Sequence, residues 1–157
     1  MKRVILISAA IISTLISFNS FAQRMSPEEQ AQAAVESRQA VFKLLAFSMG
    51  PLQGMARGGD FDQAVAVQAL ERIQTLAPMI PELFAADTTD YDFETRALDS
   101  IWGDMDGFAD AANNLVMGAN AAMDIINSEG AGGVRNAIQE VGPTCGACHD
   151  AYRDRAE

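Results

Sequence analysis

The sequence predicts an all-α protein in which four helices pack into one bundle. Apolar residues recur at spacings of three and four along four long segments, capping and stop signals separate these segments, and almost no stretch alternates as a strand would. The predicted helices span about 26–49, 61–77, 96–127 and 131–155.

Local signals mark where the first two predicted helices begin and end. Ser26 can cap the first helix, with Pro27 at its first position and Glu29 completing a capping box. Gly50-Pro51 is expected to disturb or end this helix. Asp60 is the expected N-cap of the second helix.

Prolines and glycines also divide the second half of the chain. Pro78 and Pro81 should stop the second helix, and the longest irregular stretch is expected from 81 to about 92. Ser128-Glu129-Gly130 separates the last two helices. Pro143 lacks an N–H, so it should kink the last helix or restart it just before residue 145.

The apolar residues of the first, third and fourth segments line up on one face each, as in helices that bury a single seam. Arg38 takes a seam position in the first segment, where an apolar residue would be expected. The other seam residues are Val35, Phe42, Leu45, Met49 and Leu52, then Ile101, Trp102, Met105, Phe108, Ala112, Leu115, Ala119, Ala122 and Ile126, and finally Val134, Ile138, Val141, Cys145, Cys148 and Tyr152.

The run Cys145-Gly146-Ala147-Cys148-His149 contains the only two cysteines and the only histidine of the 157 residues. C-x-x-C-H is typical of covalent haem c attachment, in which both thiols bond to the haem vinyl groups and the imidazole binds iron. Positions i, i+3 and i+4 of a helix share one face, so all three side chains can reach one flat ligand. Because both cysteines lie in the last seam, the haem is expected between the helices.

Other uses of these residues fit less well. A thioredoxin-like redox pair or a stray disulfide would use the cysteines, but the redox pair calls for a βαβ setting that the sequence does not show. A structural zinc site needs four protein ligands, and the chain has three Cys and His residues in total.

Residues 1–22 have the composition of an export signal. Lys2 and Arg3 give a charged start, 4–15 form an apolar stretch, and Ser20-Phe21-Ala22 matches a small-x-small cleavage site. A membrane anchor is the alternative, but the apolar stretch is short for a span. The mature chain is therefore expected to be one domain, 23–157, and the c-type class implies that it lies in the periplasm.

The mature chain is strongly acidic. Cleavage removes Lys2 and Arg3 from 11 basic residues, which leaves 9 against 21 acidic ones and a net charge of −12. Nucleic acid is disfavoured as a partner because its binding requires a basic face. The acidity favours solubility, and it can also steer the approach of a basic partner.

The chain resembles cytochrome c′, a class of c-type cytochromes built as antiparallel up-down-up-down four-helix bundles. The resemblance implies one haem c per chain, with thioether bonds at Cys145 and Cys148 and with His149 as the axial iron ligand. It covers the whole mature chain. It is most specific in Ser26-Pro27-Glu28-Glu29-Gln30, Ser37-Arg38-Gln39-Ala40, Met49-Gly50, Ile101-Trp102 and the run from Cys145 to Arg153.

The same resemblance implies further haem contacts. Arg38 and Gln39 match the family's propionate-binding pair, and Thr95 is the expected contact from the loop before the third helix. An arginine on an apolar seam also calls for a buried anion, which a propionate would supply, although its long side chain can instead reach the bundle edge. Arg153 matches a basic residue on the proximal side of the haem, and a plain surface role suits it equally.

By this resemblance, Phe42 faces the iron on the side opposite His149. Phenylalanine has no lone pair to donate, whereas relatives with methionine at this position resemble six-coordinate, low-spin electron carriers. Met49 lies two turns further along, roughly 10 Å along the helix axis, too far to replace it. We therefore expect five-coordinate, high-spin iron.

A vacant apolar distal site favours small diatomic gases that need no distal hydrogen bond, namely NO and CO. The expected protein is a periplasmic cytochrome that binds these gases and undergoes one-electron redox, and is not an enzyme. A low-spin electron carrier for an unidentified, basic redox partner is the alternative. A peroxidase is disfavoured, because no distal acid–base residue accompanies Phe42.

No stable membrane insertion is expected of the mature chain. The resemblance implies homodimers that pair through the first two helices, but no exposed stripe in the sequence establishes one.

Overall fold

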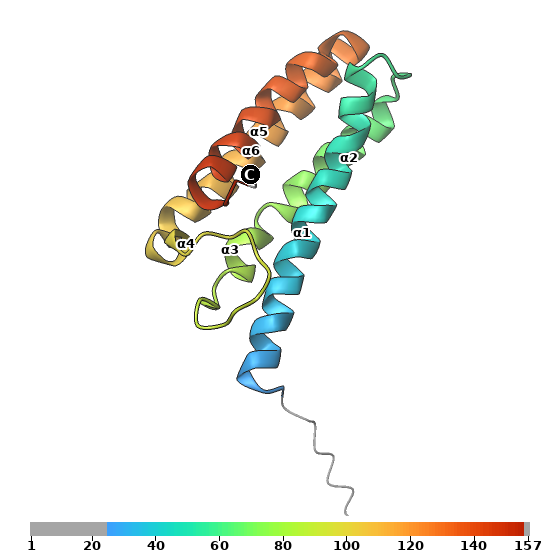
Figure 1. The fold of residues 1–157 in the computed structure, drawn as a ribbon. Helices are drawn as coiled ribbons and strands as arrows, with labels where there is room; N and C mark the ends of the chain where they lie inside the picture. Colours follow the sequence, from blue (N-terminus) through green and yellow to red (C-terminus); the bar gives the residue numbers. More distant parts are fainter. Residues whose placement is uncertain (1–24, 156–157) are drawn as a thin grey trace, which may run out of the picture.

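The computed structural model describes residues 25–155, in which four long helices run up, down, up and down in chain order (Figure 1). The expected all-α four-helix bundle is confirmed. Two short helices and a 3₁₀ turn join the long ones. The elements are α1 (Pro27–Ala56), α2 (Gln63–Leu76), α3 (Met79–Leu83), α4 (Ser100–Gly103), α5 (Met105–Glu129), η1 (Gly130–Gly133) and α6 (Val134–Tyr152).

The expected export signal, residues 1–22, lies outside the described residues. Within the described part of the chain, no helix combines the length and the apolar character that a membrane span requires.

The first helix begins as expected but ends later. The Ser26 hydroxyl accepts from the Glu29 N–H at 3.2 Å, and the Glu29 carboxylate accepts from the Ser26 N–H at 2.6 Å, which completes the capping box. The expected end at Gly50-Pro51 is wrong, because α1 continues through Pro51 to Ala56. The Phe47 carbonyl that Pro51 cannot pair belongs to an exposed residue, where water can bind it, while fully buried Leu52 anchors the last turns.

The second helix begins two residues later than expected. Asp62, and not Asp60, is its N-cap, and the Asp62 carboxylate accepts from the Val65 N–H at 3.1 Å. Gly58 has a φ of +100°, a backbone conformation that favours glycine, and it allows the turn between α1 and α2.

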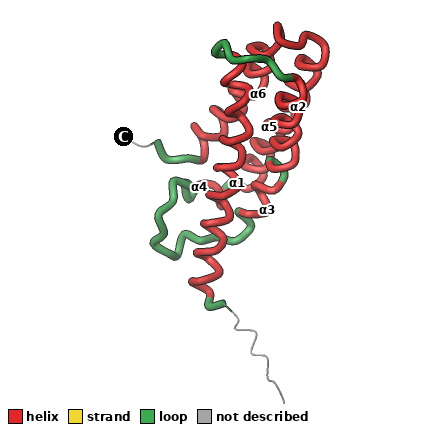
Figure 2. Tube along the Cα trace, turned by 90° about the vertical axis from the view of Figure 1, so that its right-hand side faces the viewer, coloured by secondary structure: helices red, strands yellow, loops and turns green. Residues whose placement is uncertain are grey.

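The second half of the chain departs from a simple pair of helices. An irregular stretch was expected from residue 81, but residues 81–83 belong to α3. The long loop runs over 84–99 (Figure 2). The helix expected over 96–127 is two helices, because Asp104 leaves the helical conformation with φ −143° and ψ 53° and caps α5. The last helix begins at 134 after η1.

The end of α6 also differs from expectation. It stops at Tyr152 because Arg153 is extended, with φ −128° and ψ 132°, and pairs with Ala97. Pro143 lies inside α6, which runs without interruption, so the helix does not restart before residue 145, and the alternative, a kink at Pro143, stays a prediction.

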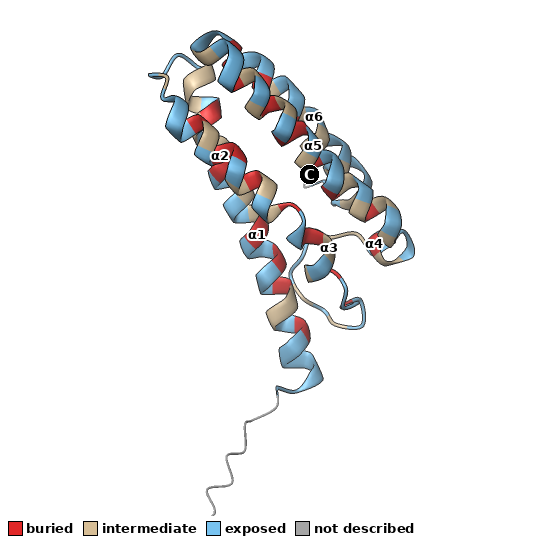
Figure 3. Cartoon of the chain, turned by 180° about the vertical axis from the view of Figure 1, so that it is seen from behind, coloured by how far each residue is buried: buried red, intermediate tan, exposed pale blue. Residues whose placement is uncertain are grey.

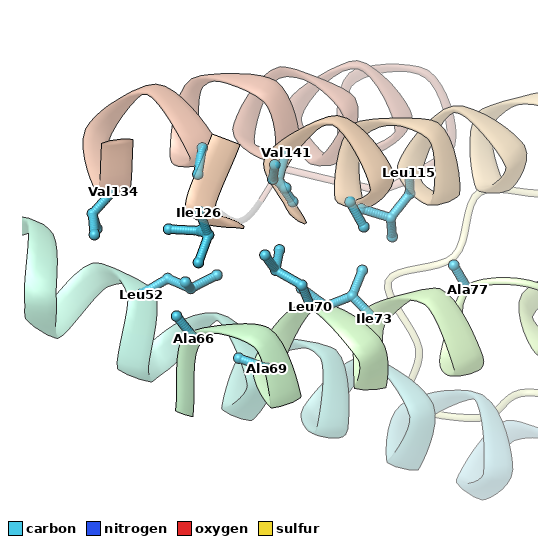
Figure 4. Packing of buried hydrophobic residues seen from close by; sticks show 13 residues of the cluster. Leu52, Ala66, Ala69, Leu70, Ile73, Ala77, Leu115, Ile126, Val134 and Val141 are labelled. Carbon is cyan, nitrogen blue, oxygen red and sulfur yellow. The ribbon is translucent and has the colours of Figure 1, made fainter. Parts of the chain in front are cut away.

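Two clusters of buried side chains form the core, and the buried positions of the helices face one another (Figure 3). In the first cluster, side chains of α1 and α2 meet those of α5 and α6 (Figure 4). The second lies where α3 and α4 meet α1 and the start of α5. The first contains Leu52, Ala66, Ala69, Leu70, Ile73, Ala77, Leu115, Ala119, Ala122, Ile126, Val134, Ala137 and Val141, and the second contains Val41, Ile80, Phe84, Ile101, Phe108 and Ala112.

The expected seams match this core closely in α5 and less closely in α1. Phe108, Ala112, Leu115, Ala119, Ala122 and Ile126 are all buried. In α1, Val41 and Ser48 are buried, while Phe42, Leu45 and Met49 are half-buried. The three half-buried residues therefore lie at the edge of the face that α1 presents to the core.

The helices α5 and α6 approach each other closely at Gly118. A Cβ atom at this position would lie 2.7 Å from the Glu140 carbonyl oxygen and 3.2 Å from a methyl carbon of Thr144. The absence of a side chain at Gly118 therefore sets the distance between the helix that carries the cysteines and its partner.

Substituting Gly118→Ala should force α5 and α6 apart and destabilise the protein by about 1–3 kcal/mol, the usual cost of overpacking. Denaturant unfolding of the haem-loaded protein would measure it. The matched control is Gly54→Ala in α1, where an added Cβ meets nothing within 4 Å, and where alanine should stabilise the helix by roughly 0.5–1 kcal/mol. Equal effects of the two substitutions would contradict the assigned contact.

Candidate functional site

The three residues of the C-x-x-C-H run lie together in the last two turns of α6. Cys145 and Cys148 are half-buried and are not joined in a disulfide. Cys145 packs against the first core cluster and Cys148 against the second, so the two thiols lie where the clusters meet. His149 follows in the last turn of the helix.

The chemistry of these groups fits haem better than a bare metal ion. Burial raises the pKa of both the Cys145 and Cys148 thiols, which keeps them protonated at neutral pH. In residues 25–155, no three or more His, Cys, Asp or Glu side chains are grouped so that they could hold a metal ion. A haem brings four of its own nitrogen ligands to iron and needs from the chain two thiols and one imidazole.

One nitrogen of His149 already faces a cation. The Arg153 guanidinium lies 3.5 Å from His149 Nδ1. Partial burial of the ring, together with repulsion by Arg153, lowers the pKa of His149, which favours the neutral imidazole that binds metals. Nε2 is the ring nitrogen that Arg153 leaves free. Arg153 therefore lies beside His149, and its expected place on the proximal side of a haem stays a prediction.

The chain beyond His149 is fastened to the loop before α4. Leu98 N–H donates to the Tyr152 carbonyl at 3.1 Å, and Asp154 N–H donates to the Arg96 carbonyl at 2.8 Å. The Arg96 guanidinium adds a bond of 2.5 Å to the Asp154 carbonyl. These bonds hold residues 96–98 against the end of α6.

A side-chain hydrogen bond fastens the same end of α6 to α5. The Tyr152 hydroxyl donates to the Asp104 carboxylate at 2.7 Å, and this bond is the main cause that raises the pKa of Tyr152 to about 12. The other oxygen of that carboxylate caps α5 through the Gly107 N–H at 3.2 Å. Sequence reasoning missed the roles of Asp104 and Arg96, although Gly103-Asp104 is a recognisable helix break and N-cap.

Arg38 is buried, as its seam position indicated, and is 4% exposed. Its guanidinium donates to the Leu83 carbonyl at 2.9 Å, the Ala86 carbonyl at 2.5 Å and the Thr88 hydroxyl at 2.7 Å. Burial lowers the pKa of Arg38 and the nearby Asp87 carboxylate raises it. The acceptors are neutral oxygens of the 83–88 segment, so this segment provides some of the hydrogen-bond acceptors that we expected from a propionate. Three of the five N–H groups of the Arg38 guanidinium donate to it.

The other two expected propionate contacts lie near each other at the surface. The Gln39 amide donates to the Glu94 carbonyl at 3.0 Å, which places it beside Thr95. The Thr95 hydroxyl accepts from the Ala97 N–H at 3.2 Å. Both side chains are exposed, so they remain accessible to an anionic group at this edge of the bundle.

Phe42 is half-buried and packs against the second cluster, as Cys148 and Tyr152 also do. Its ring meets Phe84 edge to face, with centroids 6.2 Å apart. Met49 instead packs against the first cluster. The structure thus brings Phe42 and Cys148 to the same cluster and places Met49 in the other.

Comparison with known proteins gives a consistent family. A family model described as Cytochrome C′ matches residues 33–153. Cytochrome c′ of Cereibacter sphaeroides is 36% identical over 126 residues, which cover 78% of this chain and 84% of the relative. Cytochrome c-554 of the same species is 30% identical over 149 residues, 93% of this chain and 95% of the relative. Cytochrome c-556 of Agrobacterium fabrum is 32% identical over 124 residues, which cover 78% of this chain and 82% of the relative.

Solved structures agree with this result. Cytochrome c′ from Rhodopseudomonas palustris superposes with a TM-score of 0.72 at 30% identity, covering 79% of this chain and 98% of that one. Cytochrome c′ from Shewanella frigidimarina superposes with a TM-score of 0.71 at 29% identity, covering 81% of this chain and 98% of that one. The match spans α1 to α6 and includes the C-x-x-C-H run, and the chain therefore belongs to the cytochrome c′ family of c-type haem proteins, which bind one covalent haem c per chain.

Proposed function

We propose that this cytochrome carries five-coordinate, high-spin iron, binds NO and CO, and undergoes one-electron redox in the periplasm. Cys145 and Cys148 hold the haem through thioethers, and His149 is the axial ligand. The single observation that carries the proposal is Phe42, an apolar side chain at the position that would face the open side of the iron.

The surroundings of Phe42 support an open coordination site. Its edge-to-face contact with Phe84 and its packing on the second cluster hold the ring in a fixed place. A phenyl ring cannot ligate iron, and Met49 lies two turns further along α1, roughly 10 Å along the helix axis. The Phe42 side chain offers an entering ligand no hydrogen bond and its ring hinders access, which favours small diatomic gases over larger or polar ones.

Export to the periplasm is part of this proposal. Residues 1–22 have a charged start, an apolar stretch and a small-x-small site ending at Ala22, where cleavage is expected. Covalent haem attachment in c-type cytochromes calls for such an export route, and no other part of the sequence contradicts it.

A second candidate function, low-spin electron transfer, is favoured by two observations. Two of the similar relatives are named cytochrome c-554 and cytochrome c-556, and not c′. Met105, at the start of α5, is half-buried against the same cluster as Phe42. Among the described methionines, Met105 is the one that packs against this cluster, which makes its thioether the candidate for a sixth ligand. In this case the acidic chain would steer a basic redox partner.

The absorption spectra of the haem-loaded protein separate the two functions. Ferric and ferrous spectra should be high-spin and should shift on adding NO or CO. Phe42→Met should convert the iron toward six-coordinate, low-spin form, because it adds a thioether at the open site, while Phe42→Leu should leave it high-spin. A low-spin wild-type spectrum that Met105→Leu turns high-spin would instead establish the electron carrier. An unchanged spectrum in Phe42→Met would show that Phe42 does not face the iron.

Replacing either cysteine tests the attachment site. Cys145→Ala and Cys148→Ala should each remove one thioether and lower the amount of haem that stays with the chain on a denaturing gel, and the double substitution should abolish it. Ser48→Ala, at a buried polar site in α1, is the control for general loss of folding. Full haem retention in both single variants would remove the assignment.

We further propose that the protein forms a homodimer through α1 and α2. Leu44 and Phe47 on α1 are 50% and 65% exposed, and Val65 on α2 is 38% exposed. The Arg72 guanidinium of α2 lies 5.6 Å from the Phe47 ring centroid, so the two helices share this surface. A second copy fits this surface because a solved relative, 25% identical with a TM-score of 0.69, is described as a cytochrome c′ with ligand-controlled dimer dissociation.

A charge placed in the α1 patch should break the dimer. Phe47→Glu should shift the sedimentation coefficient from dimer to monomer without changing the haem spectrum, because a carboxylate in an apolar interface loses its hydration. Met117→Glu changes a residue on α5 that is 60% exposed and should leave the dimer intact. A wild-type protein that sediments as a monomer at all concentrations would contradict the proposal.

A further inference from the structure

A cavity of about 200 Å³ opens beside His149 at the end of α6. Arg153, whose guanidinium lies 3.5 Å from His149 Nδ1, also lines this cavity, and the chain beyond α6 pairs there with the loop before α4. Its lining is almost entirely charged. The lining residues are Arg96, His149, Asp150, Arg153, Asp154 and Arg155.

The hydrogen bonding of His149 is incomplete at this cavity. When Nε2 binds iron, Nδ1 retains its hydrogen and becomes a donor. Metal-bound histidines nearly always give this hydrogen to a carboxylate, a carbonyl or water. A terminal nitrogen of the Arg153 guanidinium lies 3.5 Å from Nδ1, and a guanidinium has no hydrogen-bond acceptor. Two donors thus face the same space, and an acceptor is required between them.

The charges around the cavity favour an anionic acceptor. Arg155 forms an ion pair with Asp150 at 2.6 Å, which neutralises both. In the described part of the chain, Arg96 and Arg153 have no carboxylate oxygen within 4.0 Å, although Asp154 also lines the cavity. With a neutral imidazole, three arginines and two aspartates leave a net charge of +1. One N–H group of the Arg96 guanidinium donates to the Asp154 carbonyl, and the others are available to a ligand.

The backbone holds the two cations in place. Ala97 and Arg153 pair as a short antiparallel bridge, so the residues that carry the two guanidiniums belong to adjoining segments. The Arg96–Asp154 backbone bond of 2.8 Å fixes their relative position. Two guanidiniums and one N–H that converge on a cavity match the several oxygens of a tetrahedral oxyanion better than a single water.

We propose that the cavity binds a small inorganic oxyanion of the sulfate or phosphate type, which accepts from His149 Nδ1–H and from Arg96 and Arg153. This inference rests on the proposed role of His149 as iron ligand. Negative charge beside the imidazole makes it a stronger electron donor and stabilises ferric over ferrous iron. Anion binding therefore lowers the midpoint potential of the haem.

The test uses sulfate, whose charge does not change near neutral pH, and the haem-loaded protein. Resonance Raman of the ferrous protein first establishes an iron–histidine stretching band. Sodium sulfate is then titrated at constant ionic strength, made up with sodium chloride. In the wild type, the midpoint potential should fall along a saturable curve and the iron–histidine band should move to higher frequency.

The variants decide whether the cavity is the site. Arg96→Gln and Arg153→Gln should each weaken sulfate binding about tenfold, the factor for one lost charge-assisted hydrogen bond, and the double variant should lose the saturable response. Arg135→Gln is the charge-matched control at an exposed position near the start of α6, and it should keep the wild-type curve. If the double variant does not load haem, the two single variants carry the comparison.

The outcomes separate two kinds of failure. Absence of an iron–histidine band from ferrous haem whose absorption spectrum is high-spin would overturn the proposed ligand His149 itself. A clear band with a response that does not saturate, or that is the same in the arginine variants and in Arg135→Gln, would leave His149 in place and overturn the oxyanion site.

Discussion

The buried guanidinium of Arg38 is the constraint on which one end of the bundle depends. A buried cation must have acceptors, and the Arg38 N–H groups find them on Leu83, Ala86 and Thr88. This draws the segment after α3 onto α1. The guanidinium also lies 4.5 Å from the Phe84 ring centroid and 5.3 Å from that of Trp102. The second core cluster, against which Phe42 and Cys148 pack, is thus assembled around a charge.

The other end of that cluster is fixed by polar bonds around α6. Asp104 caps α5 with one carboxylate oxygen and accepts from Tyr152 with the other. Gly107 is required there, because an added Cβ would clash with both side chains. The backbone bonds of residues 96–98 complete the attachment. His149 therefore projects from a helix end that two other elements hold in place.

The parts of this structure that follow from short sequence patterns were predictable, and those that depend on a particular meeting of distant segments were not. Spacings of three and four residues indicate the four helices, and Cys145, Cys148 and His149 indicate the haem site. The acceptors of Arg38 are mainly backbone carbonyls, which leave no trace in a sequence. Asp62 and not Asp60 caps α2 because its carboxylate bonds the Val65 N–H. The passage of α1 through Pro51 depends on the burial of Leu52. Asp104 carried a local signal, but its partner Tyr152 is 48 residues away.

The two sides of the haem would meet opposite kinds of surface, and this asymmetry follows from the helices that supply them. On the α1 side stands Phe42, braced by Phe84, and the Arg38 guanidinium at this cluster is already bonded to oxygens of the 83–88 segment. On the α6 side, Arg96 and Arg153 lie around the imidazole and repel positive charge. Cations near the axial ligand favour ferrous iron, the state that binds CO. In the proposed haem geometry, the apolar Phe42 on the open side and the cations on the ligand side act in the same direction, since both favour CO on ferrous iron.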